Sequence, residues 1–144
     1  MVNNRIVSRF KGELPKEGGD TRISNGPLYP QEDVLGVLND GGVNTIIHWT
    51  QKCIDDQQRH ELGPEDALRL IEKALKSGRF LNSSWCIQNP KGPWAACDAY
   101  SVIERTWVQN AHKEMEFEFY VKFAIAESGA VLLLVSCHPS EERR

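Results

Sequence analysis

Hydrophobic and polar residues alternate with a period of two near the C-terminal end of this chain. From position 116 to position 126 the odd-numbered residues are apolar, and the even-numbered ones up to 122 carry a charge or a hydroxyl group. Such alternation predicts a β-strand with one face in the core and the other exposed. A Ser-Gly turn and a second apolar run follow, so the pattern predicts a hairpin of strands 117–126 and 130–138. Pro139 ends the second strand and leaves His138 at the rim of the sheet.

Helical signals come earlier in the chain. A short helix is expected after Pro30, ending at a turn rich in asparagine, aspartate and glycine. Thr50 is a good N-cap residue for a second helix that continues to about His60. The third helix begins at Pro64, with acidic residues in its first turn, and ends at Gly78.

The order of these elements predicts the fold class. Helices come first, and strands 80–87 and 97–108 precede the hairpin, with residues 43–48 as a short edge strand. This separation favours an α+β domain, in which N-terminal helices pack on one face of a C-terminal antiparallel sheet of about four strands. Residues 1–30, rich in glycine and proline, are expected to form an extended or partly disordered arm, and residues 31–144 a single domain.

Composition indicates the number of domains, the cellular location and the state of the cysteines. The chain has 144 residues, of which 40% are hydrophobic and 26% charged, and this suits one globular domain. Its first residues lack the apolar stretch of a signal peptide, and no segment reaches the roughly 18 apolar residues of a membrane span. A cytoplasmic location without a membrane partner is therefore expected. The four cysteines lack CxxC spacing, which favours reduced thiols without a metal or another cofactor. A structural zinc is the alternative, and its ligands would be Cys86, Cys97, Cys137 and His138.

Charge is unevenly distributed along the chain. The net charge is −3, but residues 31–66 hold eight carboxylates against two bases, a balance of −6, which leaves +3 for the other residues. A mildly basic surface formed by the remainder could meet phosphate groups. The alternative is that the acidic helices simply carry solvated charge.

The predicted hairpin carries residue types that suit metal-free cleavage of RNA. That reaction needs a base for the proton of the 2′-hydroxyl, a cation beside the phosphate and an acid for the leaving oxygen. His138 could serve as acid or base, Lys122 could hold the phosphate, and Tyr120 could donate a hydrogen bond or stack on a nucleobase. Three further residues are candidates for RNA binding: Arg105, Trp107 and Arg79.

Each of the hairpin residues also has a purely structural interpretation. His138 could cap the end of a strand, Lys122 could pair with a glutamate on a solvated face, and Tyr120 could be a rim aromatic without a task. Cys137 beside His138 faces the opposite side of a strand, which weakens a thiol-imidazole pair.

Four short motifs that follow the helical pair together resemble one family. They are Gly-Arg-Phe-Leu-Asn-Ser at 78–83, Asp-Ala-Tyr at 98–100, Tyr-Val-Lys-Phe at 120–123 and Val-Ser-Cys-His at 135–138. Over residues 45–138 the sequence thereby resembles the MqsR-type toxins, within the wider RelE-like class of small bacterial ribonucleases. The resemblance implies an mRNA interferase that cleaves single-stranded RNA without a metal. It also implies a cognate antitoxin, or another inhibitor protein, as a partner.

The resemblance also implies particular site residues. The strand tyrosine of the family falls on Tyr120, and its basic residue after the last strand falls on His138. The chain departs from the family at two positions, with Asn82 near the place of a lysine and Cys97 in the place of a glutamine. These departures and the overall acidity favour a competing hypothesis, a non-catalytic protein-binding module on the same scaffold, such as an immunity or regulatory protein.

Overall fold

Four long strands from the second half of the chain form the centre of the sheet. In this computed structural model, which describes residues 3–140, they are β3 (Arg79–Ile87), β4 (Trp94–Val108), β5 (Lys113–Ile125) and β6 (Leu132–Pro139). Each pairs with its neighbour in antiparallel fashion. The strands predicted at 80–87, 97–108, 117–126 and 130–138 are confirmed, and the predicted hairpin is β5 with β6.

Two short strands extend this sheet at its edges. β1 (Arg22–Ile23) pairs with β3 and β2 (Ile46–His48) pairs with β6, so the described residues form six strands in the order β1-β3-β4-β5-β6-β2. The expected number of about four strands was wrong. β2 falls within the short edge strand expected at 43–48, whereas β1 has two residues, too few to show a period. β2 runs parallel to β6, so the sheet is mixed rather than antiparallel.

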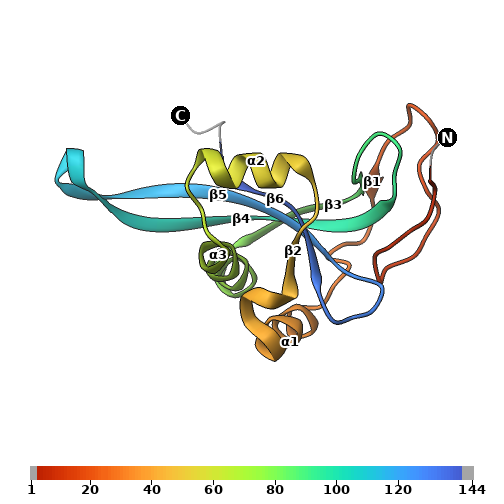
Figure 1. Ribbon diagram of the computed structural model, residues 1–144, viewed down its shortest axis with the longest axis horizontal. Helices are drawn as coiled ribbons and strands as arrows, with labels where there is room; N and C mark the ends of the chain where they lie inside the picture. The colour runs from red at the N-terminus through yellow and green to blue at the C-terminus, as the bar shows by residue number, and fades with distance from the viewer. Residues whose placement is uncertain (1–2, 141–144) are drawn as a thin grey trace.

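Three α-helices accompany the sheet over residues 3–140, and the fold class is α+β, as the order of elements predicts. The helices are α1 (Gln31–Gly41), α2 (Gln51–Arg59) and α3 (Pro64–Ser77), and a 3-10 turn, η1 (Gly42–Thr45), links α1 to β2. In Figure 1, α1 and α3 are drawn below the strands and α2 above them. Within the described part of the chain, no helix combines the length and the apolar character needed to cross a bilayer.

The position of α2 corrects the expectation that all helices pack on one face. Two residues separate β2 from α2, and α2 lies along β6 at the edge of the sheet. The hydroxyl of Thr50 fixes this position, because it accepts a 3.1 Å hydrogen bond from the backbone N–H of Cys53 and donates one of 2.8 Å to the carbonyl of Val135 on β6. The N-cap predicted from sequence is therefore confirmed, and it also anchors the helix to the sheet.

The hydrophobic core lies between the sheet and the helices α1 and α3. Leu70 and Ile71 on α3 are fully buried, as are Val121 and Phe123 on β5. The ring of Phe123 stacks on that of Tyr100 in β4, with centroids 5.8 Å apart and planes at 2°. Because successive side chains of a strand point to opposite faces, the even-numbered residues of β5 from 118 to 122 face away from this core.

The N-terminal arm is extended and is attached to the middle of the sheet. Tyr29 is buried, and its hydroxyl donates a 2.6 Å hydrogen bond to the carbonyl of Ala96. Beside it, the buried carboxylate of Asp98 accepts hydrogen bonds from the backbone N–H groups of Leu28 and Tyr29 and one of 2.6 Å from the hydroxyl of Ser83. Burial raises the pKa of Asp98, although these hydrogen bonds act in the opposite direction.

The arm is attached to the sheet at a second place. The pairing of β4 with β5 ends at Asp98 and Phe123, and the attachment lies beyond these two residues. Past this point, the segment 5–9 of the arm lies between the ends of the strands β4 and β5. It forms one isolated bridge to Trp94 in β4 and another to Ala126, directly after β5. The arm therefore supplies backbone partners that neither strand finds in the other.

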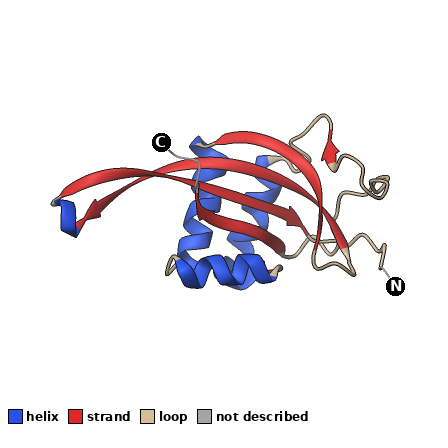
Figure 2. Cartoon of the chain, turned by 90° about the horizontal axis from the view of Figure 1, so that it is seen from above, coloured by secondary structure: helices blue, strands red, loops and turns tan. Residues whose placement is uncertain are grey.

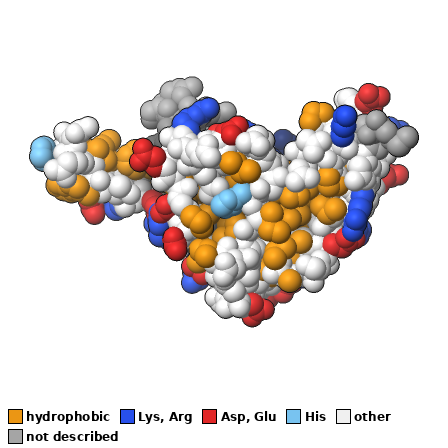
Figure 3. All heavy atoms as spheres, viewed as in Figure 1, with side chains coloured by type: hydrophobic (Ala, Val, Ile, Leu, Met, Phe, Trp, Pro, Cys, Tyr) orange, Lys and Arg blue, Asp and Glu red, His pale blue; other side chains and the backbone are white. Residues whose placement is uncertain are grey.

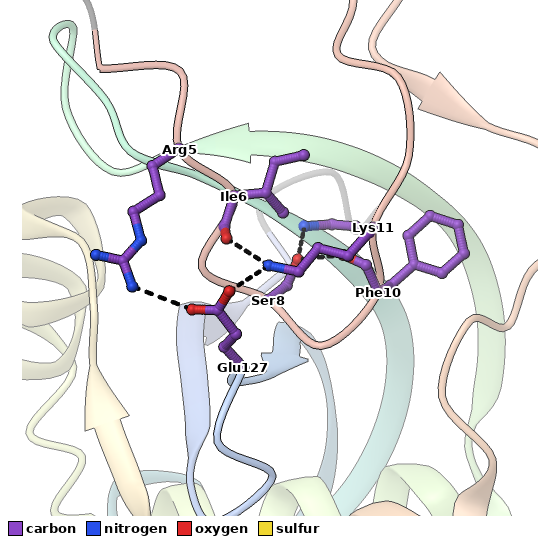
Figure 4. A network of polar contacts seen from close by, with 7 residues as sticks. Arg5, Ile6, Ser8, Phe10, Lys11 and Glu127 are labelled. Atoms are coloured by element: carbon purple, nitrogen blue, oxygen red, sulfur yellow. Dashed lines mark hydrogen bonds and ion pairs between the residues drawn. The ribbon is translucent and has the colours of Figure 1, made fainter.

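Side chains reinforce this second attachment, as Figure 4 shows. Arg5 and Lys11 both reach the carboxylate of Glu127, at 3.2 and 2.5 Å. Lys11 also donates a 2.7 Å hydrogen bond to the carbonyl of Ile6, which closes the arm into a loop. The hydrogen bonds from Lys11 and Arg5 lower the pKa of Glu127.

The hairpin of β4 and β5 projects beyond the body of the molecule as a two-stranded ribbon (Figures 1 and 2). A 3-10 turn, η2 (Gln109–Ala111), and His112, with a left-handed φ of 52°, reverse the chain at its end. Two large apolar side chains of β4 are exposed, Ile103 at 53% and Trp107 at 55%. Figure 3 shows hydrophobic side chains gathered on this projection.

Candidate active site

A cleft lies on the sheet face that points away from the core, bounded on one side by α2. Its volume is about 1100 Å³. The residues that line it from the strands include Arg79, Ser101, Glu118, Tyr120 and His138. Strand register explains this set, because Ser101 lies opposite Arg79 on one side and Tyr120 on the other, and Tyr120 lies opposite His138. These residues cross four adjacent strands in one row.

A smaller cleft of about 570 Å³ continues from the first. Lys52, Tyr120 and His138 line both clefts, so the two meet along these side chains. Lys122, two residues beyond Tyr120 on the same strand face, lines the smaller cleft. The three residues predicted to be catalytic, Tyr120, Lys122 and His138, therefore lie on one open face of the sheet.

The ring of His138 lies next to that of Tyr120. The ring centroids are 5.5 Å apart and the planes are tilted by 31°. Nδ1 of His138 lies 2.8 Å from the carbonyl oxygen of Pro139. A carbonyl oxygen can only accept, so Nδ1 carries the hydrogen, and Nε2 of the neutral ring is left as a proton acceptor.

Lys122 also lies next to Tyr120, with its Nζ 5.8 Å from the centroid of the tyrosine ring. Burial favours the neutral amine, but the charge of the Cys86 sulfur and the hydroxyl of Tyr120 outweigh it and raise the pKa of Lys122. Lys122 is therefore a cation at neutral pH. The cross-strand ion pair with a glutamate, considered from the sequence, is not found among the ion pairs of the described residues.

The wall of the main cleft comes from α2, which contributes Lys52, Asp55, Asp56 and Arg59. Lys52 and Asp56 form an ion pair of 2.6 Å in which Asp56 is nearly buried, at 10% exposure. Burial acts to raise the pKa of Asp56, but the hydrogen bond from Lys52 and the charges of Lys52, His138 and Arg59 lower it overall. Asp56 is thus a carboxylate close enough to stabilise a positive charge on His138.

The three predicted RNA-binding residues do not lie together. Arg79 lines the main cleft with Tyr120 and His138. Arg105 pairs with Glu116 across the ribbon at 3.4 Å, and Trp107 is exposed on the same ribbon, so neither lines a cleft.

The two positions that depart from the family pattern lie on the same sheet face. Asn82 follows a bulge in β3 and pairs with Ala99, and Cys97 is fully buried. Cys137 is also fully buried and lies opposite Val121, on the core side, whereas His138 faces the cleft. The alternative zinc ligands are therefore divided between two faces, and no cluster of metal-ligating side chains occurs in residues 3–140.

Sequence reasoning missed the contribution of α2 to the site. Lys52, Asp55, Asp56 and Arg59 have the spacing i, i+3, i+4 and i+7 of one helix face, a signal that the sequence does contain. It was interpreted as solvated charge, because nothing in the sequence places α2 beside β6. The thiol of Cys86 in the smaller cleft was likewise noted only as a possible zinc ligand.

Comparison with known proteins does not name this site. No protein-family model, no curated protein and no solved structure matches the chain. A function has to be argued from the side chains in the two clefts and from the motifs quoted above.

Proposed function

We propose that this protein is a cytoplasmic, metal-independent endoribonuclease of the mRNA interferase type, with a RelE-like scaffold, which cleaves single-stranded RNA in the main cleft. The observation that supports it best is the row formed by Lys122, Tyr120 and His138 on one open face. An imidazole that can take a proton and an ammonium that can hold a phosphate lie 5.5 and 5.8 Å from the centroid of one aromatic ring, that of Tyr120.

The chemistry follows from these positions. Nε2 of His138 takes the proton of a 2′-hydroxyl, whose oxygen attacks the adjacent phosphorus. The ammonium of Lys122 and the guanidinium of Arg79 oppose the negative charge that develops on the phosphate. The bond from phosphorus to the 5′-oxygen breaks, and that oxygen takes a proton from solvent, which the open cleft admits. The products are a 2′,3′-cyclic phosphate and a 5′-hydroxyl.

Two further groups support this reaction. The carboxylate of Asp56 stabilises the imidazolium that His138 becomes after it takes the proton. Tyr120 offers its ring to a nucleobase or its hydroxyl to a phosphate oxygen. The resemblance further implies a cognate antitoxin or another inhibitor protein, and we include such a partner in the proposal.

The direct test is degradation of a short single-stranded RNA by the purified protein in EDTA. We expect cleavage that leaves a 2′,3′-cyclic phosphate, because the 2′-oxygen is the nucleophile. An RNA with a single 2′-deoxynucleotide at the cleaved position should resist cleavage there and be cut elsewhere. Failure of the fully ribose substrate to be cleaved, or cleavage at the deoxy position, would contradict the proposal.

Arginine variants test which surface holds the RNA. Arg79→Ala is expected to weaken RNA binding by about tenfold, since it removes one charged hydrogen bond to phosphate from the cleft. Arg105→Ala is the matched control, because Arg105 is already paired with Glu116 on the ribbon, and it should change binding less than about twofold. Fluorescence anisotropy with a labelled RNA measures both. Equal losses in the two variants would place the RNA along the ribbon instead.

One observation favours the competing function, a non-catalytic protein-binding module. Ile103 and Trp107 expose large apolar surfaces on a projecting ribbon, and exposed aromatic residues of this kind are common anchors in protein interfaces. Glu114 and Glu116 on the facing strand suit a partner that surrounds an apolar patch with bases. A protein that leaves RNA intact in EDTA would support this function over the enzymatic one.

A further inference from the structure

Cys86 and Lys122 line the smaller cleft, and the buried Cys97 lies on the same sheet face. In the β3–β4 register Cys86 lies opposite Ala95, and Cys97 lies opposite Ser84, so the two cysteines are diagonal neighbours on one sheet face. Lys122 reaches the same face from β5, and both Lys122 and Cys86 line the cleft. The two thiols and the ammonium therefore converge from three adjacent strands.

The polar groups around Cys86 favour a negative sulfur. Cys86 is partly exposed, whereas Cys97 behind it is fully buried. The hydroxyl of Ser84 lies 3.9 Å from the sulfur of Cys86. A hydrogen bond from Cys97 lowers the pKa of Cys86 to about 6, and the charge of Lys122 adds to this effect, while burial opposes it. Burial and the neighbouring Cys86 raise the pKa of Cys97, which keeps its proton and remains the donor.

The other two cysteines provide a contrast within the same molecule. Cys53 and Cys137 are fully buried in the core. Burial raises the pKa of each to about 12, so both are neutral thiols at physiological pH. Among the four cysteines of the chain, Cys86 is thus the one that combines partial exposure, a cleft and a nearby cation.

The second thiol does not make this pair a disulfide switch. Diagonal neighbours in an antiparallel pair have Cα atoms about 7 to 8 Å apart. Disulfides require Cα atoms within about 7 Å unless the backbone moves. Cys97 therefore remains a thiol. It donates a 3.6 Å hydrogen bond to the carbonyl of Ala95, and it also acts on Cys86, whose pKa it lowers.

We propose that Cys86 is a nucleophilic thiolate site for small hydroperoxides, with Lys122 as its counter-cation and Cys97 as its hydrogen-bond donor. The sulfur attacks one peroxide oxygen, an S–O bond forms and the O–O bond breaks. Sulfur is oxidised by two electrons to a sulfenic acid, and the peroxide is reduced to a hydroxide or alkoxide that takes a proton from solvent. This site does not depend on the proposed ribonuclease activity, and its test uses no RNA.

The pH dependence of alkylation tests the thiolate. Iodoacetamide labelling of the Cys86 peptide, followed by mass spectrometry, should rise with a midpoint near pH 6, because a lowered pKa leaves the thiolate present above that pH. At pH 6 the folded protein holds roughly 500-fold more thiolate than a thiol with a pKa near 9, and the lower nucleophilicity of the thiolate offsets this by about 30-fold. We expect Cys86 to react about 20-fold faster in the folded protein than in the urea-unfolded chain.

Variants and an oxidant complete the test. Lys122→Met and Cys97→Ala should each raise the midpoint, whereas Lys122→Arg, which keeps the cation, should leave it near pH 6; circular dichroism confirms that each variant is folded. After treatment with hydrogen peroxide, dimedone should label Cys86, while Cys53 and Cys137 serve as internal controls that stay unlabelled. A wild-type midpoint at or above about pH 8.5, or dimedone labelling that spares Cys86, would overturn the proposal.

Discussion

Replacing Asp98 by alanine is expected to lower the free energy of unfolding by about 3 kcal/mol, since several buried donors lose their acceptor at once. The backbone N–H groups of Leu28 and Tyr29 and the hydroxyl of Ser83 all point at this one carboxylate. Their replacement partners would have to be water molecules in a site where Asp98 is fully buried. Urea denaturation at pH 7, followed by tryptophan fluorescence, measures the loss.

Asp98→Asn is the matched variant. Its amide oxygen can accept from the two backbone N–H groups and its amide nitrogen can donate to the hydroxyl of Ser83, so a loss of less than about 1.5 kcal/mol is expected. An alanine variant as stable as the asparagine one would show that Asp98 does not hold the arm to the sheet.

Comparison of the wild type with Asp98→Asn also reports the ionisation of Asp98. Because burial raises its pKa in the folded protein, the stabilisation linked to its proton is full below the pKa of the unfolded chain, about 4. That stabilisation is lost as the pH rises through the higher folded value. The wild type should therefore gain stability relative to Asp98→Asn when the pH is lowered from 7 to 4. Some carboxylates, such as Asp66 and Glu127, have lowered pKa values, and their contribution to stability changes with pH in the opposite direction. That contribution is the same in both proteins, so it cancels in the difference between their free energies of unfolding.

Replacing His138 by alanine is expected to reduce the rate of RNA cleavage by a factor of about 10² to 10⁴, the usual contribution of one acid-base group. The variant should remain folded, because His138 is only partly buried and its ring makes one hydrogen bond, to the adjacent Pro139. Single-turnover cleavage in EDTA measures the effect. Added imidazole should restore part of the rate, since it can occupy the space left beside Tyr120 and take the proton.

The matched control is a histidine outside both clefts. His112 is exposed at the end of the ribbon with a left-handed backbone, a conformation that asparagine tolerates, so His112→Asn should cleave RNA at the wild-type rate. Retained activity in His138→Ala would remove the imidazole from the reaction and leave the cleft without its proposed base.

Local patterns predicted most of the secondary structure of this protein. Thr50 and Pro64 mark the starts of α2 and α3 because capping and dihedral preferences act within one turn of helix. The alternation along β5 placed Tyr120 and Lys122 on one face because the direction of side chains in a strand depends on parity alone. Both inferences need only neighbouring residues.

What the sequence did not predict depends on contacts between distant residues. β1 exists because β3 offers it an edge, and its two residues carry no period; the parallel pairing of β2 with β6 likewise does not follow from the short edge strand expected at 43–48. The wall of the cleft was missed for the same reason, since α2 lies beside β6 through contacts between distant residues, such as the hydrogen bond from Thr50 to Val135. Likewise, the influence of Lys122 on Cys86 arises from the order of strands in the sheet, which spacing along the chain does not give.

The segment 5–9 of the N-terminal arm depends on contacts with the far end of the chain. Its ion pair between Arg5 and Glu127 joins positions 122 residues apart in sequence. Contacts of such long range raise the contact order and slow folding, because a large loop must close before they form. During synthesis on a ribosome, this early segment lacks its partners around Ala126 until β5 has emerged, so we expect its amide hydrogens to be among the last to gain full protection from exchange.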